Sequence, residues 1–196
     1  MKKAAFSLFS LLIFAGSAFG QTGQWRLDKA HSSISFSVSH MVISEVKGSF
    51  RDFDIAITSS REDFTDASIN ASINVASVST NNERRDGHLK TDDFFNAEKY
   101  PQIKFTSTSF EKVDGKNYKI HGMLTIRDVT KEVTFDAVYE GSLHTAQGSL
   151  VAWKATTSIN RFDYGLKWNR TIETGGLVAG ENVVITLSLE FNRQNT

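Results

Sequence analysis

A short segment of the sequence, residues 81–96, gathers most of the side chains that could carry out chemistry. Arg85, Asp86 and His88 stand there within four consecutive residues. An aspartate beside a histidine can orient a general base, and an arginine can bind an anionic headgroup. The alternative is a structural cluster that pins a short helix over one end of the fold, because residues two positions apart do not share a helical face. The sequence leaves both interpretations open.

Other kinds of chemistry find little support in the residue types. The chain has no cysteine, which excludes a thiolate metal site, a cysteine nucleophile and disulfide bonds. None of its five histidines falls in an H-x-x-x-H or H-E-x-x-H spacing, so we expect no metal centre and no cofactor. Basic and acidic residues, 22 of each, give no electrostatic footprint for nucleic acid. What remains is a soluble globular domain.

The elements that would position these residues follow a period of two, which is typical of half-buried strands. Residues 28–32, which include His31, are expected to form a turn that enters the first strand. The parity of the apolar residues changes near Asp52, which indicates a bulge or bend. About eight strands are expected, from the alternating segments 33–40, 46–50, 53–57, 67–75, 103–105, 118–126, 133–139, 151–155 and 183–191.

This pattern predicts an all-β fold: one domain, built as an eight-stranded antiparallel barrel with a short helix over one end. Long strands with one apolar face and a single proline favour a closed barrel, because closure removes exposed edges. Thr80 or Asn81 is expected to cap the short helix, and residues 160–180 are expected to be irregular. A barrel of this size is either filled by its own side chains or holds one small ligand.

Residues 1–20 have the pattern of a cleavable secretory signal peptide. Lys2 and Lys3 form a positive start, an uncharged apolar run follows, and Ala18-Phe19-Gly20 supplies small residues at the cleavage positions. We therefore expect a signal peptide at 1–20, a barrel domain at 21–196, and an exported mature protein that is soluble. The alternative is an N-terminal membrane anchor, although the apolar run is at the low edge of the length that spans a bilayer.

Several motifs of the mature chain, taken together, resemble the YceI-like family. Each motif is weak alone, but they occur in order over nearly the whole mature chain. The matching motifs are Asp28-x-x-His31-Ser32-x-Ile34-x-Phe36-x-Val38-x-His40, Val46-x-Gly48-x-Phe50, Arg85-Asp86-x-His88-Leu89, Asp93-Phe94-Phe95, Tyr100-Pro101, Phe105-x-Ser107, Gly122-x-Leu124-Thr125-Ile126-Arg127 and Asn160-Arg161-x-Asp163-Tyr164-Gly165.

The resemblance implies a lipocalin-like barrel in an exported, periplasmic bacterial protein that holds a long isoprenoid or other amphipathic lipid in its lumen. Some members of the family are associated with membrane b-type cytochromes. The resemblance therefore adds a quinone to the candidate ligands and such a cytochrome to the candidate partners. The family is not known for one established reaction, so we expect a protein that is not an enzyme and that carries or sequesters its ligand.

Two alternatives stay open beside this interpretation. One is an enzyme that acts on a small amphipathic substrate through Arg85, Asp86 and His88. The other is a stress-related scaffold whose barrel is filled by side chains. The sequence does not decide between a monomer and a homodimer.

On the lipid-binding interpretation, the inward-facing apolar residues line a ligand tunnel, although the same residue types would also fill a closed core. His40 continues the parity of the apolar face and could hydrogen-bond a quinone carbonyl at the mouth. It could equally be satisfied by the backbone, Asp28 or Asp86. Tyr164 or Trp168 could stack on a ring headgroup, or their segment could plug the barrel end. The candidate ligand-binding residues are Ile34, Phe36, Val38, His40, Ile69, Ile73, Phe94, Phe105, Leu124, Phe135, Trp153, Phe162, Tyr164 and Trp168, with Arg85, Asp86 and His88 as a headgroup-binding or structural cluster.

Overall fold

The computed structural model describes residues 23–146, 148–171 and 176–194, and the expected signal peptide at 1–20 lies outside them. Within these ranges the chain forms eleven strands and three short helices. The strands are β1 (Gly23–Leu27), β2 (Ser33–His40), β3 (Ser44–Phe50), β4 (Phe53–Ser59), β5 (Ser68–Asn74), β6 (Val78–Ser79), β7 (Gln102–Asp114), β8 (Asn117–Ile126), β9 (Val129–Thr145), β10 (Gly148–Asn160) and β11 (Ala179–Gln194). The helices are η1 (Val75–Ser77), α1 (Glu83–Leu89) and η2 (Arg161–Tyr164).

The strands form one antiparallel sheet that closes on itself. From β1 the sheet runs through β4, β5, β7, β8, β9 and β10 to β11, and β11 pairs with β1 again. The closing pair joins Arg26 to Asn192 and Leu27 to Phe191. This circuit contains eight strands, so the predicted eight-stranded antiparallel barrel is confirmed.

Three positions of the barrel are each occupied by two strands placed end to end. β11 pairs with β2 along one part of its length and with β1 along the next. In the same way, β3 continues into β4, and β5 is followed by β6. The breaks fall at residues 28–32, at residues 51–52 and at η1. The bend expected near Asp52 is therefore confirmed as the break between β3 and β4.

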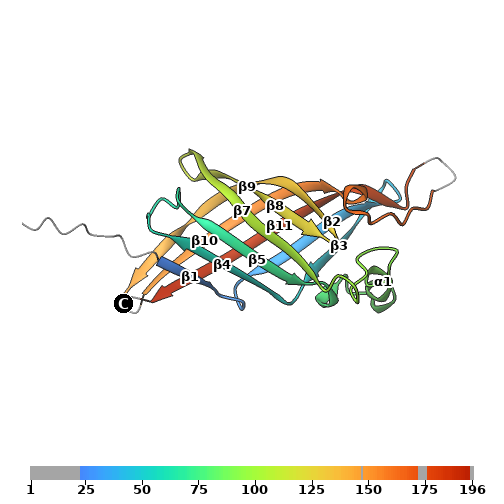
Figure 1. Cartoon of the computed structure of the whole chain (residues 1–196), viewed down its shortest axis with the longest axis horizontal. Helices are drawn as coiled ribbons and strands as arrows, with labels where there is room; N and C mark the ends of the chain where they lie inside the picture. Colours follow the sequence, from blue (N-terminus) through green and yellow to red (C-terminus); the bar gives the residue numbers. More distant parts are fainter. Residues whose placement is uncertain (1–22, 147, 172–175, 195–196) are drawn as a thin grey trace, which may run out of the picture.

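The two ends of the barrel carry different structures, as Figure 1 shows. Helix α1 lies at one end together with η2, and the C-terminal end of β11 lies at the other (Figure 1). The expected short helix is confirmed, but its cap is Asn82, whose side chain accepts from the Arg85 amide at 3.0 Å. Neither Thr80 nor Asn81 caps it, since Asn81 has a φ of +59°, whereas a cap residue needs extended backbone.

Alternation along the strands directs one face of the sheet into the barrel. On β8, Tyr118, Ile120, Leu124 and Ile126 are buried, and the side chains between them are more exposed. Gly122 lies on the buried face, where an added Cβ would lie 2.4 Å from the Phe105 ring. The glycine therefore gives this ring room to lie across the inner wall.

Candidate functional site

The barrel encloses a cavity of about 330 Å³ whose wall is almost wholly apolar. Ligand sites of small molecules have volumes of roughly 300–1,000 Å³. The barrel is therefore not filled by its own side chains, which argues against a scaffold with a packed interior. The residues predicted to bind a ligand that do lie in the wall are Ile34, Phe36, Val38, His40, Ile69, Ile73, Phe94, Phe105, Leu124, Phe135, Trp153 and Trp168.

Other wall residues follow the same alternation but were not among the predicted ones. They lie on expected strands and have the inward parity, so parity alone could have found them. These residues include Ile55, Ile57, Ile103, Ile120, Ala155, Ile185, Leu187, Leu189 and Phe191.

Aromatic side chains close the cavity at the end opposite α1. We call this group the floor, and its members are Trp25, Phe64, Phe110, Tyr118, Tyr139 and Trp153. The Trp153 ring lies at the centre, with ring centroids 5.3 Å from Phe64, 5.4 Å from Phe110 and 5.0 Å from both tyrosines. Most of these pairs meet edge to face, a geometry that aromatic quadrupoles favour. The ring surfaces at this end of the cavity therefore pack best against an apolar group.

The loop at 60–67 holds Phe64 in the floor. Phe64 is 3% exposed although its backbone has a φ of +58°. The Asp66 carboxylate fixes the loop, since it accepts from the Ser59 hydroxyl at 2.6 Å, from the Ser60 amide at 2.9 Å and from the Ser60 hydroxyl. Desolvation opposes ionisation of Asp66, but the hydrogen bonds from Ser59 and Ser60 outweigh it and lower its pKa well below the ordinary range.

One buried donor in the floor lacks a hydrogen-bond partner among the described residues. It is the indole Nε1 of Trp153, whose side chain also belongs to the cavity wall. A buried donor without an acceptor costs about 1–3 kcal/mol, although an aromatic face can supply a weak substitute. The atom is enclosed by its neighbours, so an oxygen acceptor could reach it only if the floor rearranged.

Polar side chains gather at the other end of the cavity, which we call the mouth. Its polar wall residues are His40, Thr80, Arg85, His88 and Arg161. Arg85 donates through Nε to the Thr80 hydroxyl at 2.7 Å and through Nη2 to the Thr80 carbonyl at 3.0 Å. The mouth therefore combines hydrogen-bond donors with an apolar interior.

The two acid–base candidates in α1 do not pair with each other. Asp86 lies outside the cavity wall and accepts from the Thr80 amide at 2.8 Å and the Thr80 hydroxyl at 2.5 Å. The Nε2 of His88 lies 2.7 Å from Asp93 Oδ2. The hypothesis of a catalytic unit of Arg85, Asp86 and His88 does not fit, because the helix turns residues two apart to different sides. Asp86 fits the alternative of a structural cluster, because its bonds to Thr80 hold α1 against the preceding segment.

His88 also belongs to an aromatic group at the mouth. Its ring meets Phe94 and Trp168 edge on, with centroids 5.1 Å and 5.6 Å away. The Trp168 and Phe94 rings lie 5.7 Å apart. All three side chains line the cavity, so a ring headgroup at the mouth would meet aromatic surfaces and an imidazole.

Arg161 is a functional candidate that was not among the predicted site residues. It is 4% exposed and donates to the carbonyls of Gly180, Leu166, Trp168 and Ala179 at 2.6–3.0 Å. Burial lowers the pKa of its guanidinium, and Glu181 opposes that effect. A cation directly after a strand with alternating apolar residues was the signal that could have identified it.

Two residues expected to contact the ligand lie elsewhere. Phe162 and Tyr164 are not part of the cavity wall. The Phe162 ring lies 4.2 Å from the Arg161 guanidinium, and Tyr164 is 1% exposed. Burial, with help from Asp163, raises the pKa of Tyr164 to about 12. Tyr164 is therefore not placed to stack on a ligand in the cavity. Its burial fits the alternative, in which its segment plugs the barrel end.

His40 lies in the wall at the mouth and is half-buried. Its Nδ1 lies 3.5 Å from the Ser44 hydroxyl, which also donates to the His40 carbonyl at 3.2 Å. Asp28 and Asp86, the carboxylates considered as its partners, bond His31 and Thr80. The imidazole therefore faces the cavity from the root of the β2–β3 turn.

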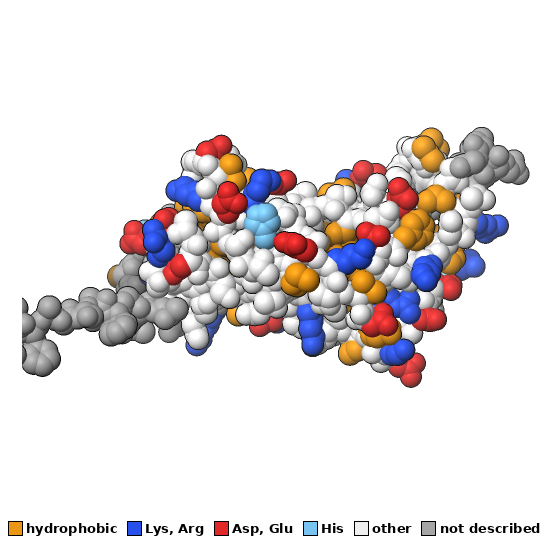
Figure 2. Space-filling model, turned by 45° about the horizontal axis from the view of Figure 1, so that its top comes forward, with side chains coloured by type: hydrophobic (Ala, Val, Ile, Leu, Met, Phe, Trp, Pro, Cys, Tyr) orange, Lys and Arg blue, Asp and Glu red, His pale blue; other side chains and the backbone are white. Residues whose placement is uncertain are grey.

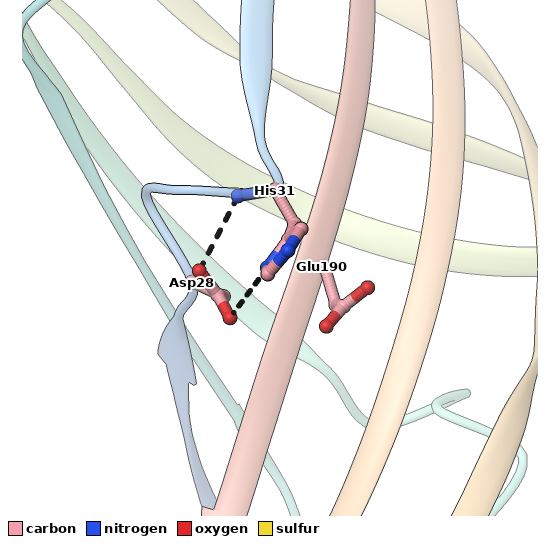
Figure 3. Close-up of side chains that lie close together, drawn as sticks. All are labelled: Asp28, His31 and Glu190. Atoms are coloured by element: carbon pink, nitrogen blue, oxygen red, sulfur yellow. Dashed lines mark hydrogen bonds and ion pairs between the residues drawn. The ribbon is translucent and has the colours of Figure 1, made fainter.

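A separate titratable group lies outside the cavity wall, where the break between β1 and β2 meets β11 (Figure 3). Asp28, His31 and Glu190 offer ligand atoms within 4.8 Å of one another. Asp28 Oδ2 lies 3.0 Å from His31 Nδ1, and this hydrogen bond lowers the pKa of Asp28 and raises that of His31. Asp28 also accepts from the Ala30 amide at 2.9 Å, which confirms the expected turn at 28–32. We assign the group to this turn.

Comparison with known proteins gives a consistent result. A family model, described as the YceI-like domain, matches residues 25–191. A UPF0312 protein of Staphylococcus aureus strain MSSA476 is 40% identical over 167 residues, which cover 84% of this chain and 95% of the relative.

Solved structures show the same barrel. The Campylobacter jejuni YCEI protein is 31% identical with a TM-score of 0.67, covering 86% of this chain and 97% of that one. Burkholderia cenocepacia BcnA is 21% identical with a TM-score of 0.74, covering 84% of this chain and 98% of that one. A polyisoprenoid binding domain from Saccharophagus degradans, implicated in plant cell wall breakdown, is 16% identical with a TM-score of 0.62, covering 88% and 99%. The last two likenesses concern the fold alone.

Proposed function

The chain belongs to the YceI-like family, and from this premise we propose that it binds an isoprenoid-tailed or similar amphipathic lipid inside its barrel. The Saccharophagus degradans neighbour, which shares the barrel fold, is a polyisoprenoid binding domain, and the proposal extends that ligand class to this barrel. The observation that carries the proposal is the apolar cavity, closed by aromatic rings at the floor and open to polar donors at the mouth.

The apolar wall favours the tail of such a ligand. Burial of apolar surface contributes about 25 cal/mol per Å², so a long hydrocarbon needs few polar contacts for affinity. The wall offers β-branched and aromatic side chains along its length and no carboxylate. The tail therefore occupies the barrel interior in this proposal.

The headgroup is placed at the mouth, where Arg85, His88 and His40 lie in the wall. These side chains recognise an oxygen acceptor, and Trp168 offers a face to a ring. A quinone, with two carbonyl oxygens on a ring, meets both requirements. A membrane b-type cytochrome would then be the partner that exchanges it.

The location belongs to the same proposal. Residues 1–20 have the pattern of a cleavable signal peptide, which supports export to the periplasm. An apolar lipid needs a shielded compartment in an aqueous space, so the barrel would carry or sequester it there.

Native mass spectrometry of the purified protein, followed by solvent extraction, tests the proposal. Ala155→Phe places a ring in the cavity wall and should lower the fraction of lipid-loaded protein by about tenfold. Ala152→Phe on the same strand is the matched control, because Ala152 is outside the wall, and it should retain the lipid. Absence of lipid from the wild-type protein, or equal loss in both variants, would contradict the proposal.

A further inference from the structure

We propose that the β2–β3 turn is a membrane-docking tip that brings the cavity mouth to the surface of a lipid bilayer. The tip consists of Met41, Val42 and Ile43, which are 42%, 67% and 89% exposed. The inference rests on the proposed function in one respect, since a bilayer is the source or destination of an apolar ligand.

The turn itself does not explain the residue types of the tip. Met41 and Val42 have φ values of +50° and +69°, and the Ile43 amide donates to the His40 carbonyl at 3.3 Å. The β-turn over residues 40–43 has both central residues in the left-handed region, which favours Asn and Gly. A β-branched residue such as Val42 is an outlier there. Apolar side chains therefore stand at a place where both the backbone and the solvent disfavour them.

The tip is continuous with the mouth of the cavity. His40, the residue before Met41, lies in the cavity wall. On the other side, the Met41 amide donates to the Val178 carbonyl at 3.0 Å, and Val178 also lies in the wall. Met41 is thus joined to the cavity wall twice, through the chain to His40 and through a hydrogen bond to Val178. A bilayer that contacts the tip therefore lies next to the mouth.

Other exposed apolar residues are placed differently. Among the described residues the large exposed ones outside the tip stand singly, and they are Val113, Met123, Val138, Leu143 and Val184. Isolated residues of this kind are ordinary on a protein surface, whereas a contiguous group marks an interaction site. Figure 2 shows charged side chains of both signs mixed over one outer face of the barrel, with hydrophobic side chains more frequent toward the α1 end.

The chemistry of the tip favours a bilayer bound by apolar insertion. The charged residues near it have both signs: Glu45 and Lys47 on β3 are exposed, and so is Arg170, whose carbonyl accepts from the Val178 amide at 2.8 Å. Among the described residues, the charges beside the tip do not form a single-sign field that would direct it to anionic lipid. None of the helices among the described residues is long and apolar enough to cross a membrane. Three apolar side chains on one turn suit a shallow contact at the interfacial region of a bilayer.

Flotation of the full mature protein with vesicles of phosphatidylcholine, and separately of phosphatidylethanolamine and phosphatidylglycerol, tests the inference. The variant Met41→Asn/Val42→Gly/Ile43→Thr should lower the vesicle-bound fraction about tenfold for both compositions. It should unfold at the same or higher temperature, because Asn-Gly suits the turn. The matched control Val113→Asn/Leu143→Thr removes exposed apolar groups at the floor end and should float like the wild type. High salt should leave the wild-type binding unchanged.

Several outcomes would overturn the inference. Equal flotation of the tip variant and the wild type would do so, and so would binding that needs anionic lipid and disappears in salt. Absence of flotation, with a dimer in sedimentation that the tip variant loses, would assign the tip to a second copy of the chain. Native mass spectrometry separates this test from the proposed function, because the tip variant should keep its lipid. A wild-type protein that floats but carries no lipid would contradict the proposed function alone.

Discussion

The floor and the mouth of the barrel are built by opposite means. At the floor, Trp153 and Phe64 pack ring against ring, and Asp66 fixes the loop that carries Phe64. At the mouth, Arg161 binds backbone carbonyls and the turn after His40 exposes apolar side chains. Closure and access are therefore located at different ends of the barrel. The floor excludes water by packing, and the mouth keeps donors beside the opening.

The largest expected effect concerns the floor. Phe64→Ala removes the ring that contacts Trp25, Tyr139 and Trp153, and it should lower the free energy of unfolding by about 3–5 kcal/mol. Guanidinium denaturation measures this. Leu143→Ala at the same end is the control, since Leu143 is 58% exposed, and its effect should stay within about 0.5 kcal/mol. Similar values for both variants would mean that the ring does not close the floor.

The mouth should respond less to a comparable change. Arg161→Lys keeps a cation but cannot reach four carbonyls from one ammonium, so buried acceptors lose their partners. We expect a loss of about 1–3 kcal/mol in the free energy of unfolding, measured in the same titration. Arg84→Lys, on the exposed side of α1, should have almost no effect. A loss larger than that of Phe64→Ala would reverse the ranking of the two ends.

The stability that Asp66 gives to the loop at 60–67 should depend on pH. The lowered pKa of Asp66 means that its contribution is present above its unfolded value of 3.8 and is lost as the pH falls through the lower folded value. The unfolding temperature of the wild type should therefore fall steeply as the pH drops below 3.8. Asp66→Asn should be less stable at neutral pH and should show a flatter acid slope. Asp54→Asn, an exposed aspartate on β4, should keep the wild-type slope.

The smallest expected effect tests whether the floor is purely apolar in function. Trp153→Phe keeps an aromatic ring and removes the unpartnered Nε1. If the headgroup lies at the mouth, the fraction of lipid-loaded protein in native mass spectrometry should change by less than about twofold. A strong loss would instead place a ligand oxygen at the floor. Such a result would invert the orientation inferred for the two ends.

Local alternation made most of the barrel predictable. The inward residues of β2, β5 and β8 could be named because side chains of a strand alternate between two faces. Strand β1 was missed, since its five residues are too short to show a period. Strand β7 was underestimated, since a register shift between Ser107 and Ser109 breaks its alternation.

The parts that the sequence did not reveal depend on contacts between distant segments. Phe64 reaches the floor through a loop with a left-handed residue, which no periodicity predicts. Arg161 acts through the carbonyls of Leu166, Trp168, Ala179 and Gly180, so its role depends on contacts that no local pattern predicts. His88 pairs with Asp93 and not with Asp86 because helix geometry decides the partner. The residue types indicated which chemistry is possible, but the hydrogen-bond partners could be identified only from the folded structure.

The pairing of β1 with β11 also has a consequence for how the chain reaches its native state. Arg26 pairs with Asn192, so the pairing that closes the barrel joins the first described strand to the last. Because loop closure over such a separation loses much chain entropy, contacts of this kind slow folding. The same strand β11 also completes the ladders of β2 and β10. An unfinished chain therefore presents open strand edges until β11 is available.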